Sequence, residues 1–174
     1  VNRRAAERFS LLAKFAVDEA ILSGDTIGLM VRVQRSVISS VDEPVPSQSL
    51  QTQFPNQDKV QYEYQWRRYR DEQWWPIGDH HPVESFPPGS EAVIEIDGEP
   101  LVWSELATRN QITPSPVVLV YASGEATPMS LLLPVISDVA NWQQVNMSES
   151  GKVRWIDASR VDPSLVSSIG PRSW

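Results

Sequence analysis

Residues 3–33 read RRAAERFSLLAKFAVDEAILSGDTIGLMVRV, and their hydrophobic pattern changes partway along. Up to Leu22 there is neither Gly nor Pro, and at about 100° per residue one side of a helix collects Ala5, Phe9, Leu12, Ala13, Ala16 and Ala20. The opposite side carries Glu7, Ser10, Lys14 and Asp18. Gly24 supplies a common helix end, and the alternation over 27–34 predicts a half-buried strand. An amphipathic helix is therefore followed directly by a strand.

The rest of the chain predicts antiparallel strands joined by turns. Residues 60–66 alternate, and Trp74-Trp75 return after a turn at 71–73. Tyr69 falls out of phase, so a β-bulge is expected near Arg67-Arg68. Three further hairpins are predicted: 92–96 with 101–103, 117–122 with 129–135, and 142–147 with 153–156. The strands of the 117–135 pair are expected to be central. One helix and seven or eight antiparallel strands indicate an α+β fold with the helix packed on a sheet.

Length and charge favour one water-exposed domain over residues 1–174. A chain of 174 residues supports a single core, and no apolar run approaches the ~20 residues that span a bilayer. Fifteen Lys and Arg against 22 Asp and Glu give a net charge of -7, which disfavours a polyanionic partner. The absence of cysteine excludes disulfides and thiolate metal sites.

Two segments are expected to lie outside the packed core. Residues 34–59 are rich in Ser, Gln and Pro and predict a long, mobile insertion. Residues 157–174 predict a flexible tail, because they contain Ser and Pro and lie at the end of the chain.

Several blocks of this sequence resemble the H-type minor pseudopilins of bacterial type II secretion systems. They follow the family's order and cover nearly the whole chain apart from 34–59 and the tail. The most specific is 117–129, which contains Ser-Gly-Glu-Ala-Thr-Pro at 123–128. The others are residues 18–24 with Ile27-Gly28-Leu29, Trp74-Trp75-Pro76-Ile77, 93–101 with Asp97-Gly98-Glu99-Pro100, and Gly151-Lys152-Val153-Arg154.

The resemblance implies a pilin-like head of two antiparallel sheets on a truncated helix. Residues 1–24 would be the C-terminal part of a stalk helix whose missing N-terminal part anchors the full-length protein in the inner membrane. The head would be periplasmic and monomeric in isolation. Its partners would be other minor pseudopilins and the major pseudopilin, with this subunit joining the tip complex to the major one during protein export.

The helix carries more apolar surface than one sheet can easily cover. Leu11, Phe15 and Leu22 lie some 100° from the centre of the main apolar side. Either the head wraps far enough round to bury them, or they form a helix-to-helix contact with a neighbouring pseudopilin. They are the candidate subunit interface.

A second interpretation comes from Trp66-Arg67-Arg68-Tyr69-Arg70, because basic and aromatic side chains together bind nucleic acid. Similar folds include FimT-like minor type IV pilins associated with DNA uptake. Arg67, Arg68 and Arg70 form the alternative nucleic-acid patch. Nearby acidic residues and the overall charge of -7 make nucleic acid the less favoured partner.

An enzymatic function is not expected. Asp79-His80-His81 has suitable metal ligands, but the further acidic clusters of phosphoesterases are missing, and a solvated turn beside Pro82 explains it better. Ser123-Gly124-Glu125 lacks the Gly-x-Ser-x-Gly elbow, and no Gly-rich phosphate loop is present. No catalytic residue, metal site or cofactor is therefore assigned. Glu19, at the edge of the apolar side, is expected to accept hydrogen bonds from the backbone or an Arg.

Overall fold

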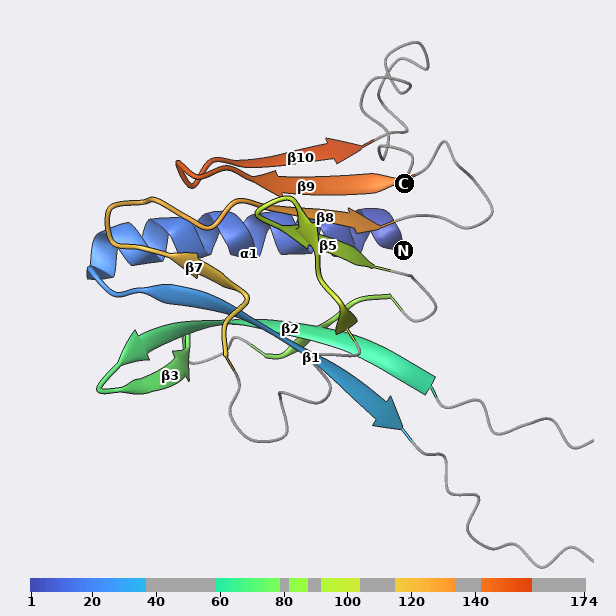
Figure 1. Cartoon of the computed structure of the whole chain (residues 1–174), viewed down its shortest axis with the longest axis horizontal. Coiled ribbons are helices and arrows are strands. Elements are labelled where there is room, and N and C mark those ends of the chain that lie inside the picture. The colour runs from blue at the N-terminus through green and yellow to red at the C-terminus, as the bar shows by residue number, and fades with distance from the viewer. Residues whose placement is uncertain (37–58, 79–81, 88–91, 104–114, 134–141, 158–174) are drawn as a thin grey trace, which may run out of the picture.

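The computed structural model describes residues 1–36, 59–78, 82–87, 92–103, 115–133 and 142–157. Within these ranges, helix α1 (Asn2–Ser23) packs against two antiparallel sheets (Figure 1). The first sheet contains β1 (Ile27–Ser36), β2 (Lys59–Arg70), β3 (Gln73–Pro76), β4 (Glu84–Ser85) and β7 (Val118–Val120). The second contains β5 (Val93–Ile96), β6 (Glu99–Pro100), β8 (Met129–Leu133), β9 (Gln143–Met147) and β10 (Val153–Asp157). The predicted α+β class and two-sheet head are confirmed.

Helix α1 lies along the line where the two sheets meet and contacts strands of both (Figure 1). It ends as predicted at Gly24, whose φ of 74° is left-handed and whose N–H donates to the Ala20 carbonyl at 3.0 Å. The predicted apolar side is buried or, at Ala5, half-buried. Ser10 was expected on the opposite, polar side but is only 3% exposed. The buried arc is wider than predicted because β9 and β10 of the second sheet also contact the helix.

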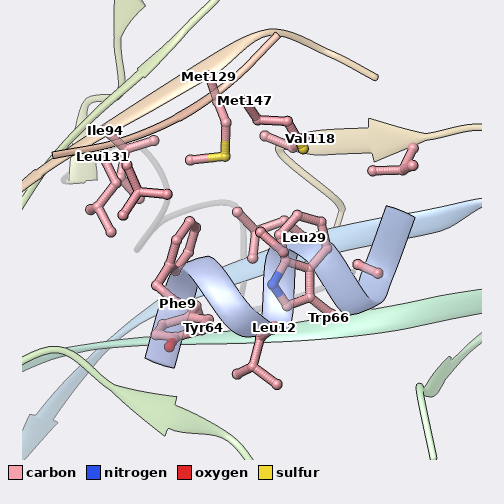
Figure 2. Packing of buried hydrophobic residues seen from close by; sticks show 14 of the residues in the cluster. Phe9, Leu12, Leu29, Tyr64, Trp66, Ile94, Val118, Met129, Leu131 and Met147 are labelled. Carbon is pink, nitrogen blue, oxygen red and sulfur yellow. The ribbon is translucent and has the colours of Figure 1, made fainter. Parts of the chain in front are cut away.

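Phe9 lies at the centre of the core and is fully buried (Figure 2). Its ring meets Tyr64 edge-on with 5.0 Å between centroids, and Trp66 and Phe86 lie at 6.3 and 6.2 Å. Ile94 and Leu131 of the second sheet belong to the same buried cluster. The helix therefore joins both sheets in one continuous core.

The β1–β2 pairing runs without interruption from Ile27 opposite Arg68 to Ser36 opposite Lys59, so the predicted bulge near Arg67-Arg68 is wrong. Tyr69 is out of phase because it lies on the far face of β2, where it packs against Trp74 at 4.9 Å. The turn to β3 is confirmed; its two residues, Asp71 and Glu72, both have left-handed φ.

Strands β7 and β8 do not form the predicted central hairpin. β7 pairs with β1 at the edge of the first sheet, whereas β8 lies between β5 and β9 in the second. The chain crosses between sheets after an isolated bridge from Val120 to Ala126. There the Ala126 N–H donates to the Glu149 carbonyl at 2.8 Å, which ties this crossing to the β9–β10 turn.

The two segments that were expected to lie outside the core, 34–59 and 157–174, are shorter than predicted. β1 continues through Ser36 and β2 begins at Lys59, so residues 34–36 and 59 belong to strands; 37–58 lie outside the described residues. Likewise Asp157 ends β10, and 158–174 lie outside the described residues. Their expected mobility stays a prediction.

Gly124 gives a direct test of the crossing between the sheets. Gly124→Val is expected to lower the free energy of unfolding by about 1–3 kcal/mol, because φ is 87° and an added Cβ would lie 3.2 Å from Ile21 Cδ1. Glu125→Ala is expected to stay within about 0.5 kcal/mol, since the Glu125 side chain is exposed. Urea denaturation of both variants measures the difference, and equal losses would contradict the assigned turn.

Candidate subunit interface

The side of α1 that faces away from both sheets carries large apolar side chains. Leu11 is 56% exposed, Phe15 42% and Leu22 83%. The sequence left open whether these residues are core or surface, and the structure places them at the surface. They are exposed because the helix turns its opposite side, with Phe9 and Ala13, into the core.

The three side chains follow one line along the helix. Leu11 and Phe15 are four residues apart and so are neighbours on the helix surface, and Leu22 lies two turns beyond Phe15. From Leu11 to Leu22 the line extends about 16 Å at the usual rise per residue. Asp18, which is exposed, lies between Phe15 and Leu22. Such a row has the spacing of a ridge that packs into the groove of another helix. We call Leu11, Phe15 and Leu22 the outer helix row.

The C-terminal end of the helix is fixed by a cluster of charges. Arg68 of β2 forms an ion pair with Glu19 of the helix and another with Asp25 at 3.6 Å. Arg70 donates from Nη2 to the same Asp25 carboxylate at 2.6 Å. The predicted arginine partner of Glu19 is therefore confirmed. These pairs hold the end of α1 on β2 and thereby fix the direction in which the outer helix row points.

The structure does not bring the three arginines of the alternative nucleic-acid patch together. Arg68 and Arg70 project on the helix side of β2, where carboxylates neutralise them. Arg67 is on the other face because neighbouring strand residues alternate, and its Nε donates to Gln65 Oε1 at 2.8 Å. Described residues thus offer no continuous row of these three guanidinium groups.

Several exposed apolar side chains were not singled out from the sequence. Ile21 is 51% exposed beside the Gly124 turn, Tyr121 is exposed on that same turn, and Trp75 and Val102 are exposed elsewhere. The helical pattern could have indicated Ile21, since it falls outside the apolar side. The other three lie on strand and loop segments, where exposure depends on which edges remain uncovered.

Within the described ranges, no group of three or more His, Asp or Glu side chains is placed to hold a metal ion. The Asp79-His80-His81 motif lies outside the described residues. Nor is any helix in the described part of the chain long and apolar enough to cross a membrane.

Two solved structures of the minor pseudopilin EpsH, from the type II secretion system of Vibrio cholerae, resemble this structure over most of both chains. One matches with a TM-score of 0.57 over 92% of this chain and 96% of EpsH. The other matches with a TM-score of 0.55 over 90% and 96%. This chain has the fold of EpsH. Sequence identity is 20% in both comparisons, so the likeness establishes the shared fold. No protein-family model matches the sequence, and no curated protein matches it significantly.

The arrangement of the arginines predicts weak binding to DNA. Because Arg68 and Arg70 are paired with carboxylates and the net charge is -7, we expect no retardation of duplex DNA at micromolar protein in a gel-shift assay at about 0.15 M salt. Micromolar binding that falls steeply with salt and disappears in Arg67→Gln would contradict this expectation.

Proposed function

We propose that this chain is a minor pseudopilin, a structural subunit of the type II secretion pseudopilus, and that it packs against a neighbouring pseudopilin through the outer helix row. The observation that carries the proposal is the exposure of Leu11, Phe15 and Leu22 on the helix face that neither sheet covers. The fold shared with the minor pseudopilin EpsH supports it. The role is structural rather than enzymatic.

In this proposal the subunit joins a tip complex of minor pseudopilins to the major pseudopilin, with its head on the periplasmic side. The resemblance in the sequence motifs and the position of the outer helix row support this role. A contact along one helix suits a linking subunit, since the two sheets remain available for contacts of another kind.

The free energy expected from burying the outer helix row explains why an isolated head would be monomeric. Fully burying one Leu or Phe side chain contributes about 1.5–3 kcal/mol, and Phe15 is already partly covered. Two free heads also lose translational and rotational freedom on association, which costs an estimated 4–15 kcal/mol. Tethering the subunits in one assembly raises their effective concentration and reduces this cost. The same contact can therefore be weak in solution and effective in the filament.

Two phenylalanines on opposite sides of α1 form a matched pair for testing the proposal. Phe15→Ser is expected to lower the melting temperature of the isolated head far less than a core substitution does, because the ring is 42% exposed. Phe9→Ser is expected to destabilise it severely, since even Phe→Ala in a core costs about 3–5 kcal/mol. In cells, Phe15→Ser and Leu11→Ser should reduce both co-purification with other minor pseudopilins and protein secretion.

Two results would contradict the proposal. If Phe15→Ser melts as poorly as Phe9→Ser, the outer helix row is part of the core. If the Phe15→Ser and Leu11→Ser double variant folds normally and still supports assembly and secretion, the row is not a subunit interface. Tyr121→Ser, which changes an exposed side chain on the β7–β8 crossing, serves as the surface control.

A further inference from the structure

A pocket opens on the first sheet, on the face turned away from α1. Its volume is about 150 Å³, and the side chains from that face of β1 and β2, together with one from the segment before β4, are Met30, Arg32, Glu63, Gln65, Arg67 and Val83. None of these residues belongs to the outer helix row, and the function proposed above does not use them.

The register of β1 and β2 builds this pocket. Arg32 lies opposite Glu63, Met30 opposite Gln65, and Arg67 follows two residues later on the same face. An arginine therefore stands near each end, with a methionine and a carboxamide between them. The position opposite Arg67 is Gly28, where an added Cβ would lie 2.8 Å from the Trp74 ring. The close fit of Trp74 on Gly28 fixes the sheet surface beside Arg67.

The charges in the pocket do not cancel. Arg32 forms an ion pair with Glu63, which is buried. Arg67 donates to the neutral Gln65 at 2.8 Å, and no carboxylate of the described residues forms an ion pair with it. Burial, followed by the nearby charge of Arg32, lowers the pKa of Arg67, so the environment opposes its positive charge. Among the described residues that line the pocket, two guanidinium groups face one carboxylate, which leaves one positive charge uncompensated.

We infer that this pocket binds one carboxylate group on a short aliphatic stem, with Arg67 as its principal partner. A guanidinium group matches a carboxylate in shape and can donate two parallel hydrogen bonds to it. Met30 and Val83 offer apolar contact for the stem. A cavity of about 150 Å³ can hold a molecule of the size of benzene, so this pocket has room for an aspartate- or glutamate-sized group. A phosphate dianion would place excess negative charge near Glu63 and is less suitable.

Methionine methyl groups allow this inference to be tested directly. The protein has three methionines: Met30 lines the pocket, whereas Met129 and Met147 lie in the core of the second sheet and serve as internal references. The chain labelled with ¹³C-methyl methionine is titrated with N-acetylglutamate N-methylamide and with its uncharged glutamine counterpart. Only the glutamate derivative should shift the Met30 resonance saturably.

Two arginine variants test which positive charge binds the carboxylate. Arg67→Gln should weaken binding of the glutamate derivative at least tenfold, while Arg154→Gln, an exposed arginine on β10, should leave it unchanged. Unshifted Met129 and Met147 resonances confirm that each variant is folded. If the ligand is a carboxylate of a protein, an acidic tripeptide should bind more tightly than butyrate. Equal binding of the two would identify the ligand as a free organic acid. Both results support a carboxylate site.

Four results would overturn the inference. They are an unmoved Met30 resonance, an equal shift with the glutamine derivative, unchanged binding in Arg67→Gln, and tighter binding of inorganic phosphate than of the glutamate derivative. None of them would affect the proposal for the outer helix row, because that row lies on α1 and the pocket opens on the opposite face of the first sheet.

Discussion

The structure depends on one constraint, the burial of a single side of α1 against two sheets at once. Phe9 meets this constraint most completely, because its ring contacts Tyr64 and Trp66 of the first sheet and shares a buried cluster with Leu131 of the second. Small residues on the same side, such as Ala13 and Ala16, let the helix lie close to both sheets. Neither sheet has another long apolar element to cover it within the described residues, so the helix completes both.

The same constraint determines which surface is left over. A helix that turns Phe9 toward two sheets must turn Phe15 outward, and the Arg68 pairs with Glu19 and Asp25 prevent the helix end from rotating away from β2. The outer helix row is thus a consequence of how the core is built. On the far side of the first sheet, the strand register places Arg67 in a pocket without a carboxylate partner among the described residues. The fold therefore presents two chemically different surfaces, one apolar and one cationic.

Structural features that depend on local periodicity could be predicted from the sequence. Features that depend on where the second sheet packs could not. The helix end at Gly24 and the β2–β3 turn follow from residue type, and both are confirmed. The burial of Ser10 and the exposure of Phe15 depend on how much of the helix the two sheets cover, which no local pattern encodes. For the same reason, β7 and β8 read as one hairpin although they belong to different sheets. The Arg67 pocket was not predicted, because it arises from the alignment of β1 with β2.

The central claim is that the side of α1 that neither sheet covers contacts another pseudopilin, and cross-linking from that side tests it most directly. The chain has no cysteine, so Asp18→Cys introduces a unique thiol between Phe15 and Leu22 while keeping the outer helix row intact, and Arg154→Cys provides one on an exposed strand position. A short maleimide cross-linker with a photoreactive second group is applied to cells that are actively secreting. Position 18 is expected to cross-link to another pseudopilin, and position 154 is expected to do so far less. Equal cross-linking from both positions, or none from position 18, would contradict the claim.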